Sequence, residues 1–150
     1  SEAVLVGGFV IAGSEPLTVA VRAIGKGLTR FGVTSPAADV KIEMYAGDRV
    51  IATNDDWKTA INRTAIEAAG LSPPDDTDAV VWVTLAAGAY TAVVQDKGSG
   101  GVCTLEVFNV DGGSKSRLVK RGILMSLNQE SRQSCLGSSS TALRVWVICR

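Results

Sequence analysis

Apolar and polar residues alternate along much of the chain, the pattern of β-strands that are buried on one face. The alternation is clearest in residues 17–25 (LTVAVRAIG) and 40–45 (VKIEMY). Successive side chains of a strand point to opposite faces, so one face of each segment is expected in a core. The core-facing residues are Leu17, Val19, Val21, Ala23, Val40, Ile42 and Met44.

Short turns that contain glycine separate the strand-like runs. The turn Ala46-Gly47-Asp48 lies between two alternating runs and predicts a hairpin over residues 40–53. The turn Ala86-Ala87-Gly88 predicts a second hairpin, over residues 79–96, by the same reasoning. A glycine-rich turn at residues 98–101 then leads into the next strand.

That next strand is residues 102–110 (VCTLEVFNV), in which Cys103 shares a face with Leu105 and Val107. We expect Cys103 to be a buried thiol. The first strand, residues 4–13, is apolar on both faces, as a central or covered strand would be. The pair Gly7-Gly8 inside it predicts a bulge or a close backbone approach.

One segment has helical character, residues 62–69 (NRTAIEAA), with a cap at Thr59 or Asn62 and a stop at Gly70. We expect it to cross between two sheets. Short strands with a turn every 8 to 12 residues or so predict an all-β fold, an antiparallel β-sandwich of jelly-roll or Ig-like type. A chain of 150 residues fits one domain.

The C-terminal part differs in composition, since beyond Gly112 the chain is enriched in Ser, Lys, Arg and Gln. We divide the chain into a β-sandwich module (residues 1–118) and a C-terminal extension (residues 119–150). The extension ends in a strand-like run, residues 142–150 (ALRVWVICR), with apolar residues on both faces. It is expected to pack on the same domain or on a neighbouring subunit.

Two interpretations of the end strands stay open. Both ends pair within their own sheet, or one end strand completes a neighbouring subunit by β-strand addition. The residues expected to carry assembly in the second case are Val4, Val6, Phe9, Ile11, Val145, Trp146, Val147 and Ile148.

Charge narrows the classes of partner. Fifteen basic and fifteen acidic residues cancel, and no cluster of Lys and Arg with interleaved aromatics is present, so nucleic acid is not an expected partner. A neutral chain is also poorly protected against self-association. No apolar run reaches the roughly 18 residues of a membrane span, so none is expected.

Catalytic chemistry is limited by the absence of histidine from the sequence. Ser-His-Asp and Cys-His catalysis and the H-E-x-x-H zinc site all need that residue. The carboxylates lie mostly in turns, where Asp and Asn occur for their bonds to the backbone. We therefore expect a protein that is not an enzyme.

Calcium is the one cofactor considered. Calcium takes six to eight oxygen ligands, which loops rich in Asp and Asn supply. The candidate ligands are Asp48, Asn54, Asp55 and Asp56, joined by Asp39 or Asp111. The alternative is a set of turn residues that bond to their own backbone.

The cysteines and tryptophans leave alternatives open. Cys135 and Cys149 are the closest cysteine pair in sequence and form the candidate disulfide, although three buried thiols fit the sequence equally well. Trp57, Trp82 and Trp146 suit packing in a core or interface, and carbohydrate is the candidate ligand if they form an exposed platform.

A family resemblance emerges from several motifs taken in order: RAIGKGL with FGV close behind, then NDDW, then GAYTAVV and a glycine-rich turn. Residues 4–118 resemble a β-sandwich module found, often in tandem, in large secreted bacterial proteins, and the second half is similar to the pre-peptidase C-terminal type of domain. The resemblance implies an exported accessory module with no catalytic site. Residues from Ile123 onward depart from the pattern.

Together these observations predict a secreted, non-catalytic structural subunit at the bacterial surface. It would self-assemble into a fibre or surface layer by pairing terminal strands or sheet edges. The alternative is a monomeric extracellular module that binds carbohydrate or another surface ligand, with calcium as a candidate aid.

Overall fold

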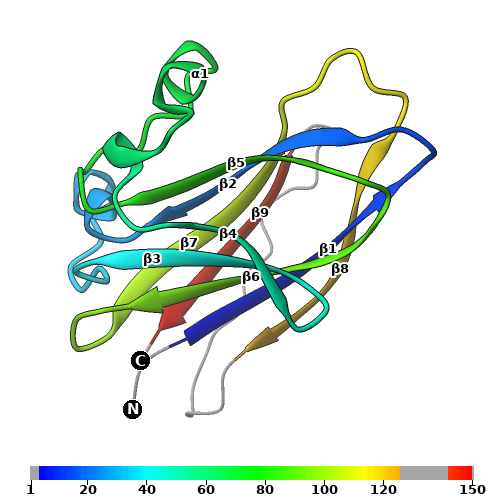
Figure 1. The fold of residues 1–150 in the computed structure, drawn as a ribbon. Coiled ribbons are helices and arrows are strands. Elements are labelled where there is room, and N and C mark those ends of the chain that lie inside the picture. The colour runs from blue at the N-terminus through cyan, green and yellow to red at the C-terminus, as the bar shows by residue number, and fades with distance from the viewer. Residues whose placement is uncertain (1–3, 126–141, 150) are drawn as a thin grey trace.

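The computed structural model describes residues 4–125 and 142–149, with side chains as far as Val119. Within these residues, nine strands form two antiparallel sheets packed face to face (Figure 1). The strands are β1 (Val4–Ala12), β2 (Leu17–Ile24), β3 (Val40–Ala46), β4 (Arg49–Asn54), β5 (Ala79–Leu85), β6 (Gly88–Asp96), β7 (Gly101–Asn109), β8 (Arg117–Met125) and β9 (Ala142–Cys149). The short helical segments are η1 (Lys26–Phe31), η2 (Trp57–Thr59) and α1 (Arg63–Ala68). The predicted all-β sandwich with one short α-helix is confirmed.

The strands run in the order β4-β3-β6-β1-β8 in the first sheet, here sheet A, and β5-β2-β7-β9 in the second, sheet B. The predicted hairpin of β3 and β4 forms around Gly47, which has a φ of 63°. The second predicted hairpin is wrong, because β5 pairs with β2 in sheet B whereas β6 pairs with β1 and β3 in sheet A. The turn at residues 86–88 therefore connects the two sheets.

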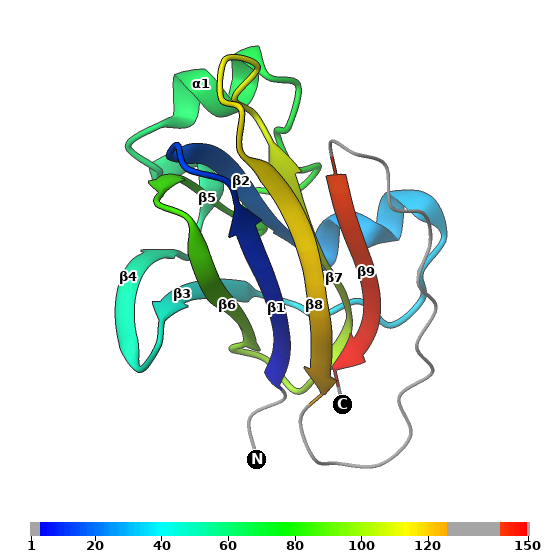
Figure 2. The same cartoon turned by 90° about the vertical axis from the view of Figure 1, so that its right-hand side faces the viewer.

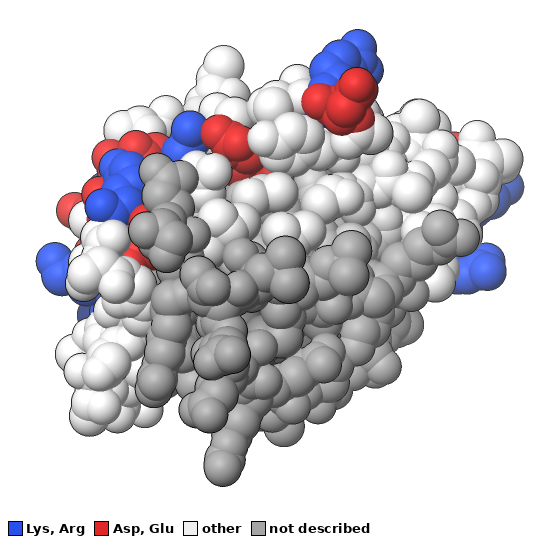
Figure 3. Space-filling view, turned by 90° about the horizontal axis from the view of Figure 1, so that it is seen from below, with Lys and Arg blue, Asp and Glu red and all other residues white. Residues whose placement is uncertain are grey.

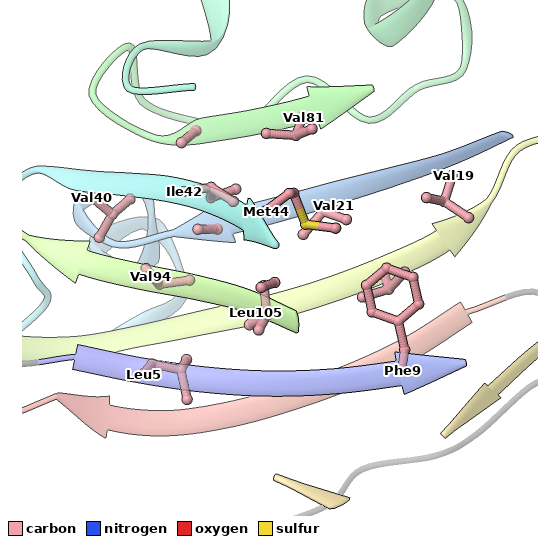
Figure 4. Close-up of a cluster of buried hydrophobic side chains, with 14 of the residues drawn as sticks. Leu5, Phe9, Val19, Val21, Val40, Ile42, Met44, Val81, Val94 and Leu105 are labelled. Carbon is pink, nitrogen blue, oxygen red and sulfur yellow. The ribbon is translucent and has the colours of Figure 1, made fainter. Parts of the chain in front are cut away.

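The core lies between the sheets and receives the faces that alternation predicts (Figure 4). Val40, Ile42 and Met44 of β3 are fully buried, as are Val19 and Val21 of β2. Strand β7 adds Cys103, Leu105 and Val107, so the prediction of a buried Cys103 is confirmed. Because the inner faces of both sheets interdigitate here, a polar substitution at any of these positions would place an unpaired group in the core.

Of the two features predicted for the glycine pair in β1, the bulge is present, whereas the close neighbour of Gly7 is a side chain and not a backbone segment. The pairing of β1 with β8 shifts register between Gly7 and Gly8, which is a bulge. A Cβ atom on Gly7 would lie 2.6 Å from Cδ2 of Leu105 in the opposite sheet. The absence of a side chain at Gly7 thus leaves room for the Leu105 side chain to pack against β1.

The outer face of sheet B is covered by the segment between β4 and β5. Trp57 and Ile66 from this segment pack with Ala20, Val80 and Phe108, which point outward from sheet B. The helix α1 matches the predicted residues 62–69 within one residue at each end, and Gly70 with a φ of 71° follows its last turn. The outer face of sheet B is therefore covered where β5, β2 and β7 contribute to this cluster.

The described parts of the C-terminal extension complete both sheets. Strand β8 pairs with β1 at the edge of sheet A, and β9 pairs with β7 at the edge of sheet B. The two strands lie side by side on one flank of the sandwich (Figure 2). The proposed boundary at residue 118 thus falls inside β8.

Candidate functional site

Three carboxylates and one ammonium group meet at the end of sheet A. Asp39 precedes β3, Asp55 and Asp56 follow β4, and Lys97 follows β6, so the neighbouring strands β4-β3-β6 bring the four side chains together. One oxygen atom from each of the three aspartates lies within 4.8 Å of the others. The backbone bond from Lys97 N to Asp39 O, 2.8 Å long, fixes the ends of β3 and β6.

Lys97 supplies the positive charge inside this acidic cluster. Its ammonium donates to Asp55 Oδ2 at 2.8 Å and lies 3.0 Å from Asp39 Oδ2. The hydrogen bond to Asp55, and to a smaller extent the one to Asp39, raises the pKa of Lys97 above its usual value. The other oxygens of the two carboxylates, Asp39 Oδ1 and Asp55 Oδ1, are buried and accept no hydrogen bond from the described residues. An ammonium thus already bridges two of the three carboxylates that a cation would use.

The cluster differs from the predicted calcium ligands. Asp55 and Asp56 are in it and Asp39 joins them, whereas the exposed Asp48 lies in the β3–β4 turn outside it. Asn54 is buried, and both polar atoms of its side chain form hydrogen bonds within the fold. Its Oδ1 accepts a bond from Val80 N (3.0 Å), and its Nδ2 donates to Asp56 O.

Asp111 also lies outside the cluster, in the loop between β7 and β8. Its Oδ1 accepts from the N–H groups of Gly113 and Ser114, both at 3.1 Å. It is a turn residue that bonds to its own backbone, which is the alternative that the sequence leaves open. Lys97 is the member that sequence reasoning missed, since no spacing in the chain indicates that the ends of β4 and β6 meet.

Two other aspartates are buried and bind backbone N–H groups. Asp78 accepts from the N–H groups of Gly25 (2.9 Å), Gly27 (3.4 Å) and Asp75 (3.2 Å). Burial raises the pKa of Asp78, although these hydrogen bonds act in the opposite direction. Asp96 accepts from the N–H groups of residues 39, 98 and 100. These carboxylates hold loops together.

A polar network lies on β3, on the outer face of sheet A. Glu43 accepts from Lys41 Nζ at 2.9 Å and from Tyr45 Oη at 2.7 Å. The bond from Lys41, followed by the bond from Tyr45, lowers the pKa of Glu43, and Glu43 raises the pKa of both partners. Glu43 is therefore a stabilised carboxylate, which is the opposite of what a general base needs.

The described tryptophans pack rather than form a platform. Trp57 is buried in the cluster on the outer face of sheet B, and its Nε1 donates to Asp75 O at 3.1 Å. Trp82 is partly buried against the same cluster. The side chain of Trp146 lies outside the described residues.

Valines gather in the middle of the outer face of sheet A, beside Thr91 and Gln95 of β6. The residues of β1 that point away from the core include Val4, Val6 and Val10, and the register places Val93 of β6 beside Val6 and Val119 of β8 beside Val10. We call these five residues the valine face; all are partly exposed. In the view from below, uncharged described side chains lie between the charged groups at the upper and left margins and the residues that are not described (Figure 3).

The predicted assembly residues divide into three groups. Val4 and Val6 belong to the valine face, whereas Phe9 and Ile11 are 1% exposed and belong to the core. Val145, Trp146, Val147 and Ile148 lie in β9, whose backbone pairs with β7, and their side chains are outside the described residues. Strand β1 is paired on both edges, with β6 and with β8.

The predicted disulfide lies outside the described residues, since Cys135 is not among them and only the backbone of Cys149, opposite Gly101, is described. No described helix has the length and apolar character that crossing a membrane requires. Comparisons with protein-family models, curated proteins and solved structures gave no match.

Proposed function

We propose that this chain is a non-catalytic structural module of an exported bacterial protein, and that copies associate through the valine face of sheet A. The observation that carries the proposal is the contrast between the outer faces of the two sheets. Helical segments with Trp57 and Ile66 cover sheet B, whereas no described element covers the valine face.

Physical chemistry favours burial of this face. Full burial of an exposed valine contributes about 1.5 to 3 kcal/mol, and each of these half-buried valines would contribute part of that value on contact. The net charge of zero means that copies of the chain do not repel one another over long range. A second copy is therefore the occupant that we propose.

The pairing of β1 favours contact between folded copies over exchange of the N-terminal strand. Removing β1 would break ladders with both β6 and β8 and withdraw Leu5, Phe9 and Ile11 from the core. Face contact and sheet-edge contact need no such disruption.

The test is sedimentation velocity of the whole chain and of two lysine variants. Val93→Lys places a charge on the valine face, beside Val6, and is expected to reduce the associated species. Thr84→Lys is the matched control, at an exposed position of β5 in sheet B, and is expected to leave association unchanged. Equal association of Val93→Lys and the wild type would contradict the proposal.

The second candidate function is a monomeric binding module aided by calcium. The buried, unbonded oxygens Asp39 Oδ1 and Asp55 Oδ1 favour it. The Lys97 ammonium disfavours it, because a divalent cation would have to displace that group from both carboxylates.

A further inference from the structure

The edge strands on the two flanks of the sandwich differ in how well they are protected from pairing with another strand. On one flank, side chains and backbone of residues 54–62 bind the outer edge of β5. Val80 N donates to Asn54 Oδ1 at 3.0 Å, Trp82 O accepts from Asn62 Nδ2 at 3.1 Å, and Asp78 O accepts from the N–H of Trp57 at 2.9 Å. No further strand can pair there without displacing these groups.

Strand β4, the sheet A edge on the same flank, is protected in other ways. It is six residues long, begins with the exposed Arg49, and pairs with β3 through a register shift between Met44 and Tyr45. Short length, charge and bulges are the means by which proteins prevent edge-to-edge pairing.

The opposite flank carries β8 and β9. Strand β8 has an irregular register, because the bulge at Gly7 and Gly8 interrupts its pairing with β1. Strand β9 pairs with β7 over eight residues with no shift of register. Among the described residues, no strand pairs with the outer edge of β9, which ends sheet B.

Alternation fixes which residues of β9 present backbone groups outward. On the side of β7 away from β9, the N–H of Val102 donates to Ser35 O at 2.7 Å, and the C=O of Val102 accepts from the N–H of Ala37 at 2.8 Å. Its neighbours in β7 therefore direct their backbone groups to β9, where the register pairs Cys103 with Val147. It follows that the residues of β9 whose N–H and C=O groups point to the open edge are Ala142, Arg144, Trp146 and Ile148.

We infer that β9 pairs antiparallel with β9 of a second copy about a two-fold axis, which makes a closed dimer with one continuous eight-stranded sheet. This inference rests on the proposed function, since it names how copies associate. A head-to-tail contact would bring β9 against the protected edges of β4 and β5, and only such a non-closing contact grows into a fibre. The asymmetry of the two flanks thus favours a closed dimer over a fibre.

The register follows from the same alternation. In the new strand pair, residues whose backbone groups point to the open edge must lie opposite one another. With the longest overlap of the two strands, the two-fold axis then passes through the strand pair at Val145 or at Trp146. Arg144 then lies opposite Trp146 or Ile148 of the partner subunit and not opposite its own copy. Both registers avoid like charges directly across the new strand pair.

The dimer also explains how the valine face is used. A two-fold axis perpendicular to sheet B keeps sheet A of both copies on the same side of the assembly. The two valine faces then form one larger apolar surface, suited to contact with another dimer. Edge pairing and face contact are therefore separate interfaces, and each can be tested alone.

The closing experiment is hydrogen exchange of the full chain, read at single-residue resolution, at high and at low protein concentration. The amides of Arg144, Trp146 and Ile148 are expected to exchange at least about tenfold more slowly in the concentrated sample. The amides of Val145 and Val147, which face β7, are the internal control and are expected to be protected at both concentrations.

A variant provides a second measurement. Trp146→Pro removes an outward N–H, a position at which an edge strand tolerates proline, and is expected to abolish the concentration-dependent protection at residues 144 and 148. Rapid exchange at these positions in a protein that remains associated would overturn edge pairing and leave the valine-face proposal standing. Filaments of unlimited length would overturn the closed dimer. A monomer at the highest concentration would overturn both.

Discussion

The Asn54 side chain accepts a hydrogen bond from the backbone N–H of Val80, 3.0 Å away, and so joins the end of β4 in sheet A to the edge of β5 in sheet B. The same amide donates to Asp56 O. A residue that sequence reasoning places among calcium ligands therefore serves to close one flank of the sandwich.

Replacement of Asn54 by alanine is expected to destabilise the fold by about 1 to 3 kcal/mol, because the buried Val80 N–H loses its acceptor. Urea unfolding followed by tryptophan fluorescence measures the change. The control is Thr53→Ala at the preceding exposed position, with an expected change within about 0.5 kcal/mol. Equal effects of the two substitutions would show that the bond to Val80 contributes little.

Gly27 is expected to be intolerant of a side chain. A Cβ atom there would overlap the Asp78 carboxylate, which backbone bonds hold in place, so Gly27→Ala should cost about 1 to 3 kcal/mol. Gly112→Ala is the control, because a Cβ there meets nothing within 4 Å, and its effect should be neutral or slightly stabilising. Thermal unfolding of both variants tests the difference, and a neutral Gly27→Ala would contradict it.

Asp78 is expected to oppose stability as pH rises. Its pKa in the folded state lies above the usual 3.8, so the folded protein binds the proton more tightly than the unfolded chain does. Its contribution is most favourable below pH 3.8 and is lost as pH rises through the folded pKa. Asp78→Asn should remove this slope from the unfolding free energy.

Because Asp78→Asn also costs a backbone hydrogen bond, the diagnostic is the change in pH dependence and not the change at one pH. The free energy of unfolding measured from pH 3 upward should show the difference between wild type and variant narrowing as pH rises. A constant difference would mean that Asp78 has the same pKa in both states.

Lys97 is expected to exclude calcium from the acidic cluster. Millimolar calcium should therefore leave the Tm of the wild type unchanged. Lys97→Met leaves Asp39, Asp55 and Asp56 without the ammonium, so this variant should lose stability at neutral pH and regain part of it with calcium. The control is Lys58→Met, which removes a surface ion pair with Asp76 and should not respond to calcium. A rise in the wild-type Tm with calcium would instead favour the binding-module interpretation.

Sequence patterns predicted the local structure well and the pairing of strands less well. The faces of β2, β3 and β7 follow from alternation, because burial on one side imposes a period of two. The sequence could not predict that the consecutive strands β5 and β6 lie in different sheets, since a turn such as Ala86-Ala87-Gly88 suits a hairpin and an inter-sheet connection equally.

The candidate sites show the same limit. Asp55 and Asp56 were identified because they lie together in the sequence, whereas Lys97 joins them only through the order β4-β3-β6. The apolar character of both faces of β1 was visible in the sequence, and the structure adds that Val6 and Val10 lie on the uncovered side. Local alternation in the sequence does not indicate which strands pair with one another over long range.

Association of the wild-type chain is tested by measuring its mass by light scattering over a range of concentrations. Pairing through β9 predicts a concentration-dependent oligomer with an even number of chains, formed from the two-fold dimer. A constant mass of one chain at every concentration would contradict it.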